Sequence, residues 1–149
     1  MVEVVDRQAF DLVLVALRRN DLDGVGGRLA GLFGQPPLLF FGNNPRGRAG
    51  LPAGLPGPAH LGFPGVGGTL KNDVAEYVRI TQQPTAIEAS SEPRLNEVQV
   101  ALERRGFSVQ RVPDVSGWLA YHACSSPASP RPCIAAKPIR GEWPATPSC

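Results

Sequence analysis

The hydrophobic positions in the first third of the chain predict two buried strands joined by a helix. Residues 10–17 read F-D-L-V-L-V-A-L, a nearly continuous apolar run that is typical of a parallel strand covered on both faces. Residues 37–42 form a second, shorter apolar run. Between them, residues 20–33 carry apolar side chains at helical spacing, although several glycines weaken that helix. A strand, a helix and a strand in this order form a βαβ unit.

The middle of the chain predicts short strands separated by turns. Residues 45–57 are rich in proline and glycine, which favours a loop or one short helical turn. Residues 60–63 and 74–80 have the composition of strands, with a turn-rich segment at 64–68 between them. A connection of this kind usually makes an antiparallel hairpin, so we expect a mixed sheet.

The last third of the chain predicts the clearest helix, over residues 93–105. Its apolar side chains fall on one face, and Gly106 stands in the position that commonly ends a helix. Residues 107–112 alternate as a short strand, and residues 115–123 begin another helix.

Periodicity stops near Ser125. Residues 125–149 contain six prolines in 25 residues, which predicts a disordered tail rich in Pro, Ser and Ala. We therefore expect an α/β domain over residues 1–124 followed by that tail.

Composition and charge indicate one domain and exclude several classes of partner. The chain of 149 residues has the size of one domain, and 17 glycines with 16 prolines indicate many loops. Fifteen basic and thirteen acidic residues leave a net charge of +2, too small to predict a nucleic-acid partner. The apolar runs are too short for a membrane span, and an N-terminus with Glu3 and Asp6 does not resemble a signal sequence, so we expect a cytoplasmic protein.

Most candidate chemistry has a structural interpretation. The glycines of residues 24–31 fail the G-x-G-x-x-G spacing because Leu29 occupies the last glycine position. His60 and His122 lack the surroundings of a catalytic triad and are interpreted as packed or surface residues. The carboxylates, Glu88 among them, are scattered and are interpreted as solvated, and no metal site is predicted.

Two polar residues follow the predicted buried strands. Arg18 comes after the first strand and Asn43 after the second. In open α/β sheets ligands bind beyond the carboxyl ends of the strands, which makes both residues candidates for ligand binding. The alternatives are that Arg18 is a surface residue beginning the next helix and that Asn43 forms a turn before Pro45.

The order of these segments resembles the NADPH-dependent ketopantoate reductase family, also called 2-dehydropantoate 2-reductase, over residues 10–124. The motifs that carry the resemblance are D-L-V-L-V-A-L-R, F-F-G-N-N-P, G-F-P-G-V-G-G-T with Y-V-R-I, the helix at residues 93–105, F-S-V-Q-R-V and Trp118. The resemblance implies a Rossmann-like NAD(P)-binding domain with a mixed sheet, in truncated form.

The resemblance also implies roles for individual residues. Arg18 would pair with a phosphate or ribose of NADP, Asn43 would contact both the nicotinamide and the 2-keto acid substrate, and Gly67 would approach the cofactor. The implied activity is transfer of a hydride from NADPH to a 2-keto acid.

Three departures from the family affect that activity. The family's glycine loop comes before the region matched, and only ten residues precede the first matched motif, D-L-V-L-V-A-L-R, here. Ala120 stands at the position of the family's catalytic lysine, so we expect no catalytic residue in this chain. The family's helical substrate domain is replaced by the tail. We therefore expect a truncated copy with weak activity or none.

Two alternatives remain open at this point. One is a non-catalytic interaction module that associates, with itself or another protein, through an exposed sheet edge. The other is a divergent reductase-like protein that acts on a different substrate.

Overall fold

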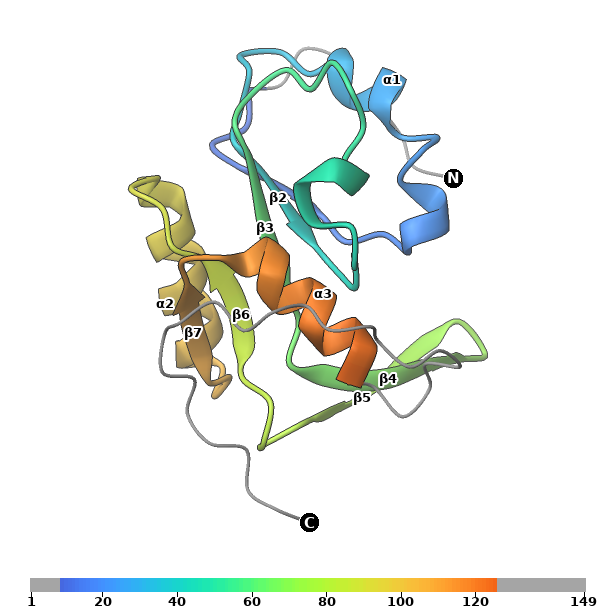
Figure 1. The fold of residues 1–149 in the computed structure, drawn as a ribbon, viewed down its shortest axis with the longest axis vertical. Coiled ribbons are helices and arrows are strands. Elements are labelled where there is room, and N and C mark those ends of the chain that lie inside the picture. Colours follow the sequence, from blue (N-terminus) through green and yellow to red (C-terminus); the bar gives the residue numbers. More distant parts are fainter. Residues whose placement is uncertain (1–8, 126–149) are drawn as a thin grey trace.

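The structure is a computed structural model that describes residues 9–125 (Figure 1). Within these residues the chain is a mixed α/β fold, as the sequence predicts. Its main sheet has the strand order β1-β2-β3-β6-β7, and β4 and β5 form a separate hairpin. The main-sheet strands are β1 (Val13–Val15), β2 (Leu38–Phe41), β3 (Ala59–Phe63), β6 (Thr85–Glu88) and β7 (Val109–Val112).

The sheet is mixed because one strand pair in its middle is antiparallel. β1, β2 and β3 run parallel to one another, and β6 runs parallel to β7, but β3 and β6 are antiparallel. The antiparallel partner of β3 is thus β6, a strand that the sequence did not predict, and not the strand at residues 74–80.

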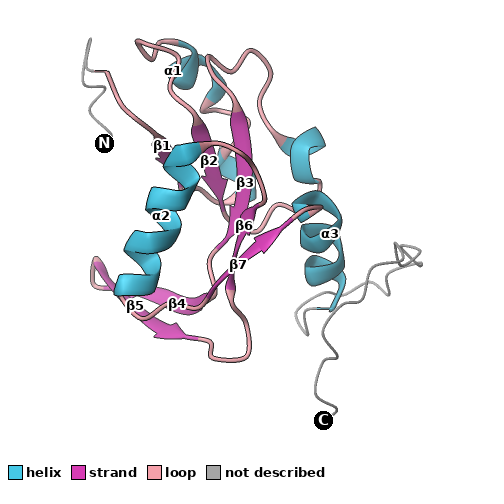
Figure 2. Cartoon of the chain, turned by 90° about the vertical axis from the view of Figure 1, so that its left-hand side faces the viewer, coloured by secondary structure: helices cyan, strands magenta, loops and turns pink. Residues whose placement is uncertain are grey.

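Two helices cover the two faces of the sheet. Figure 2 shows α2 (Pro93–Arg104) on one side and α3 (Val115–Ser125) on the other. Leu95 of α2 packs with Leu39 and Ile87, and all three side chains are fully buried. On the opposite face Leu119 of α3 packs with a larger core cluster that contains Phe40, Leu61 and Ala86.

The termini of α2 match its predicted bounds. The Glu92 carboxylate accepts the Arg94 backbone N–H at 3.2 Å, and Pro93 occupies the first turn, where its missing N–H costs nothing. Gly106 has a φ of +79°, the left-handed conformation that commonly ends a helix.

The segment between β1 and β2 is less regular than predicted. It contains the 3-10 turn η1 (Arg19–Asp21) and the short helix α1 (Gly26–Ala30) in place of one helix over residues 20–33. The glycines account for the interruption, since each lowers the stability of a helix by about 1 kcal/mol relative to Ala. Leu22 and Leu29 still pack into the core.

The first strand is shorter and more exposed than predicted. β1 spans three residues of the apolar run at 10–17, and Leu14 and Leu17 are 51% and 38% exposed. The prediction of a strand covered on both faces was wrong, because Val15 is buried on one face while Leu14, on the other face, is half exposed. β1 also lies at the edge of the sheet.

The β4–β5 hairpin consists of β4 (Val66–Lys71) and β5 (Val74–Arg79), antiparallel to each other. Asn72 and Asp73 turn the chain with φ values of +50° and +61°, as two-residue hairpin turns require. The turn predicted at residues 64–68 was wrong, because β4 begins at Val66. The predicted tail also begins differently, since Ser125 is the last residue of α3 and the rest of the tail lies outside the described residues.

Candidate functional site

The carboxyl ends of β1 and β2 lie at the same edge of the sheet because the two strands are parallel. Gly42 comes directly after β2, and a Cβ atom on it would lie 3.1 Å from the Leu17 carbonyl oxygen. The chain segments that leave the two strands are therefore in close contact. Arg18 follows Leu17 and Asn43 follows Gly42, so these two predicted residues reach one edge, as the sequence indicates.

A small hollow lies at this edge. Its volume is about 10 Å³, and its lining comprises Val15, Leu17, Leu22, Phe40, Phe41, Gly42, Asn43 and Asn44. Such a volume holds about one water molecule, whereas pockets for cofactors measure roughly 300–1,000 Å³. The described residues thus form an edge that a ligand can touch but not a cleft that encloses one.

The two neighbouring asparagines at the end of β2 have different surroundings. Asn44 is buried; its side-chain amide donates to the Gly47 carbonyl at 2.7 Å, and its oxygen accepts the Arg46 N–H at 3.3 Å. Asn44 therefore stabilises the turn that leads into η2 (Gly47–Gly50), and of the loop or short helical turn that the sequence predicts for this segment the structure has the turn. Asn43 is exposed.

Arg18 is an exposed residue that precedes a helical turn, as its interpretation as a surface residue before the next helix expects. Its backbone is extended and precedes η1, and its carbonyl accepts the Asp21 N–H at 3.0 Å. Its side chain is exposed at the carboxyl end of β1. The guanidinium is therefore accessible to an anion from solvent.

Gly67 lies in strand β4, opposite Val78. A Cβ atom on Gly67 would meet the Ile80 Cδ1 atom at 3.7 Å, an ordinary contact distance. Packing within the described residues therefore does not require glycine here. The tighter position is Gly65, where a Cβ atom would collide with the Gln83 carbonyl.

Ala120 lies on α3 next to an aromatic cluster. The rings of Trp118 and His122 are stacked with centroids 5.1 Å apart, and Phe63 at the end of β3 packs against both. Burial lowers the pKa of His122 below its usual value of 6.5. The Nε2 atom of the His122 ring lies 3.4 Å from the Gln83 side-chain nitrogen. In the neutral ring this Nε2 atom is suited to accept a hydrogen bond from that nitrogen. His122 is a packed residue, as predicted.

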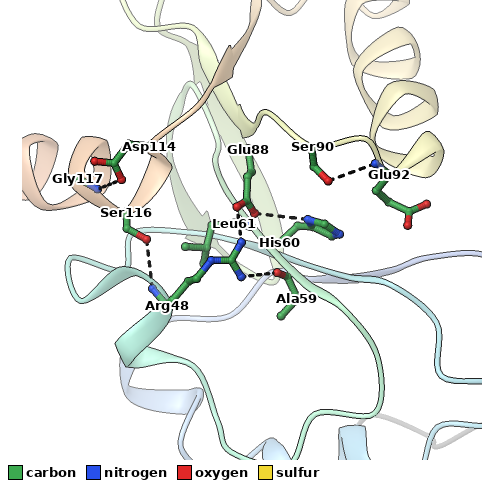
Figure 3. Close-up of polar contacts among 10 residues, drawn as sticks. All are labelled: Arg48, Ala59, His60, Leu61, Glu88, Ser90, Glu92, Asp114, Ser116 and Gly117. Carbon is green, nitrogen blue, oxygen red and sulfur yellow. Dashed lines mark hydrogen bonds and ion pairs between the residues drawn. The ribbon is translucent and has the colours of Figure 1, made fainter. Parts of the chain in front are cut away.

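A second polar cluster links η2 to the sheet, and the sequence did not predict it (Figure 3). The Glu88 carboxylate pairs with the Arg48 guanidinium and accepts the Leu61 N–H at 3.1 Å. Arg48 also donates to the Ala59 carbonyl at 2.7 Å. The Glu88 side chain is only 13% exposed, so its interpretation as a solvated carboxylate was wrong. Arg48 and Glu88 are 40 positions apart, and no local pattern connects them.

His60 lies beside this cluster. Its Nδ1 atom is 3.4 Å from the second Glu88 oxygen, and neither ring nitrogen has a hydrogen-bond partner among the described residues. The residue is 8% exposed, so of the two interpretations as a packed or a surface residue the structure has the packed one. Glu88 is the last residue of β6 and lies beside the first half of β3, which places this cluster away from the carboxyl ends of β1 and β2.

Comparison with known proteins adds no relative, since no protein family model, curated protein or solved structure matches this chain. Within residues 9–125 no helix is both long and apolar enough to cross a bilayer. In the same residues no group of three or more His, Cys, Asp or Glu side chains is placed to hold a metal ion.

Proposed function

We propose that this chain is a ketopantoate-reductase-like NADPH-dependent oxidoreductase in truncated form, which binds NADP weakly and transfers hydride to a 2-keto acid poorly or not at all. The observation that carries the proposal is the shared edge of β1 and β2. Arg18 and Asn43, two residues to which the resemblance assigns cofactor contacts, follow parallel strands whose ends are in contact. In a Rossmann-like sheet this is the edge where dinucleotides bind.

The chemistry of the two side chains supports such a role. An exposed guanidinium forms charge-assisted, bidentate hydrogen bonds to phosphate, and an exposed amide both donates and accepts, as a carboxamide such as nicotinamide requires. Gly67 would add backbone contact where β3 leads into β4.

Three features limit the affinity for NADP and the rate of hydride transfer. The hollow at the edge has a volume of about 10 Å³, so most of a bound dinucleotide would stay in contact with water. The glycines at the start of α1 lack the G-x-G-x-x-G spacing that holds a pyrophosphate at a helix N-terminus. The Ala120 methyl group cannot polarise a keto group or donate a proton.

The proposal is tested by titrating the full chain with NADPH and following chemical shifts of backbone amides. Millimolar binding with shifts near Arg18 and Asn43 supports it, and both Arg18→Ala and Asn43→Ala should weaken binding. Arg104→Ala is the matched control, since Arg104 is exposed on α2. Absence of any shift at these residues would contradict the proposal, and micromolar binding would contradict the expected loss of affinity.

The chemical step needs its own assay. NADPH oxidation is measured with a panel of 2-keto acids and aldehydes, first with the natural chain and then with Ala120→Lys. A gain of turnover on Ala120→Lys with 2-keto acids supports the reductase ancestry. Turnover of an aldehyde by the natural chain would instead favour the divergent-reductase alternative.

A second candidate function is a protein interaction module. It is favoured by the apolar side chains that the structure leaves exposed on the β4–β5 hairpin and on β1, including Leu70, Val78 and Leu14. Exposed apolar side chains mark an interaction site where they form a continuous patch.

A further inference from the structure

We propose that β1 is a dimerisation edge, at which two copies of this chain pair their β1 strands antiparallel about a two-fold axis. The inference does not depend on NADP binding. It starts from the disagreement between the sequence of β1, which has the composition of an internal strand, and its place at the edge of the sheet.

The apolar residues around β1 are not covered by the rest of the described chain. β1 ends the strand order at one edge of the sheet (Figure 2). Leu14 in its middle is 51% exposed and Leu17 just beyond it is 38% exposed. Natural edge strands usually carry charges or proline that prevent pairing with another chain, and residues 12–17 have neither.

The backbone of β1 has hydrogen-bonding groups directed away from the sheet. Val13 donates its N–H to the Pro37 carbonyl at 2.9 Å, so Val13 faces β2. Because successive residues of a strand alternate in direction, the N–H and C=O of Leu14 point to the open edge. Leu14 can therefore exchange a pair of hydrogen bonds with Leu14 of a second copy.

The sequence of β1 is self-complementary when it is read about Leu14. With Leu14 on a two-fold axis perpendicular to the sheet, Val13 of one copy faces Val15 of the other, and Leu12 faces Ala16. Side chains that face each other in an antiparallel pair share one side of the sheet, so these apolar pairs contact directly.

The charge at the end of the run favours the same arrangement. Asp11 before the run is paired with Arg94 of its own chain at 2.7 Å, whereas the Arg18 side chain after the run is exposed. In the register centred on Leu14, Arg18 of one copy faces Phe10 of the other, so the two Arg18 side chains lie at opposite ends of the pair. A parallel pairing in register would bring these two like charges together.

An isologous two-fold contact of this kind closes on itself, so it predicts a dimer and not a filament. The two five-stranded sheets would join into one continuous sheet. The exposed Leu14 side chains of the two copies would cover each other at its centre.

The test is the mass of the full chain in solution, measured by sedimentation equilibrium over a range of concentrations. We expect a mass of twice 15.8 kDa at high concentration. Leu14→Lys places two like charges opposite each other and should raise the dimer dissociation constant about tenfold or more. Val78→Lys on the hairpin, where Val78 is 71% exposed, is the matched control and should change it less than about twofold.

A second variant tests the register. Ala16→Lys places a charge opposite Leu12 of the other copy and should also weaken the dimer. Circular dichroism of each variant verifies folding, and the Leu14 amide should exchange slowly with solvent only under dimeric conditions. A monomer at every concentration overturns the proposal, as does a dimer that Leu14→Lys leaves intact or that Val78→Lys dissociates.

Discussion

Strands β6 and β5 are separated by a short turn, yet β6 is almost completely buried and β5 is exposed along its whole length. Thr85, Ala86 and Ile87 of β6 are at most 3% exposed, while Tyr77 and Val78 of β5 are 62% and 71% exposed. β6 lies between β3 and β7 in the sheet, whereas β5 pairs with β4 alone. Burial in this protein therefore follows from the neighbours of a strand and not from its own hydrophobicity.

The β4–β5 hairpin contacts the rest of the chain mainly through Arg79 and Tyr77. Arg79 donates to the carbonyls of Arg105 and Gly106 at the end of α2, at 3.2 and 3.1 Å. Its guanidinium lies over the Phe107 ring, 5.8 Å from the centroid, and Tyr77 stacks on the same ring. A two-stranded hairpin is marginally stable by itself, so these contacts determine how firmly it is held.

The largest expected effect is the loss of a core side chain from the sheet. Ile87→Ala removes a fully buried side chain that packs with Leu39 and Leu95, and it should lower the free energy of unfolding by about 2–5 kcal/mol. The control Val78→Ala in the hairpin should change it by less than about 0.5 kcal/mol. Urea denaturation measures both, and equal effects would refute the contrast between sheet and hairpin.

The second effect concerns the cluster that joins η2 to the sheet. Glu88→Ala leaves the Leu61 N–H without its acceptor and Arg48 without its carboxylate, and should cost about 1–3 kcal/mol of unfolding free energy. Glu97→Ala is the control, because its pair with Arg94 is exposed and should contribute less than about 1 kcal/mol. If the two variants lose equal stability in the same urea assay, the cluster is not a structural link.

A smaller, local effect is expected for the hairpin contact. Arg79→Ala removes two hydrogen bonds and the contact with Phe107, and should destabilise the hairpin by about 1 kcal/mol. Native-state hydrogen exchange should become faster in β4 and β5 while exchange in β3 and β6 is unchanged. Lys71→Ala, at the far end of β4, is the control, and faster exchange in the sheet would show that the hairpin is not an independent unit.

The smallest effect is the pH dependence contributed by His122. Burial lowers the pKa of His122 in the folded state, so the unfolded state binds more protons between that pKa and 6.5. The contribution of the neutral His122 ring to the stability of the fold is therefore fully present above pH 6.5. It is lost as the pH falls from there toward the folded-state pKa. His122→Gln should have a smaller loss of stability between pH 7.5 and pH 5.5 in urea denaturation, and an unchanged slope would exclude His122 as its source.

Local pattern was sufficient for several elements of this fold. The apolar face and the proline at the start of α2, together with Gly106 at its end, predict its bounds to within one residue. The apolar run at residues 37–42 predicts β2, and the glycines and prolines of residues 45–57 predict a loop or one short helical turn, of which the structure has the turn. The positions of Arg18 and Asn43 at one edge also follow, because a βαβ unit makes its two strands parallel.

Other features depend on residues far apart in the chain. β6 contains only four residues, too few for a periodic signal, and becomes a strand through its pairing with β3 and β7. The pairing of Arg48 with Glu88 needs η2 and β6 to meet across the sheet, which no spacing in the sequence encodes.

The sequence by itself determined several helices and strands, among them α2, α3, β2 and β7, because capping residues, glycines and apolar periodicity act over a few neighbouring positions. Only the tertiary structure decided which strands are covered, since burial depends on what each strand pairs with. Residues 10–17 make this distinction clearest: their composition predicts a strand, and the order of the sheet leaves that strand at an edge with Leu14 exposed.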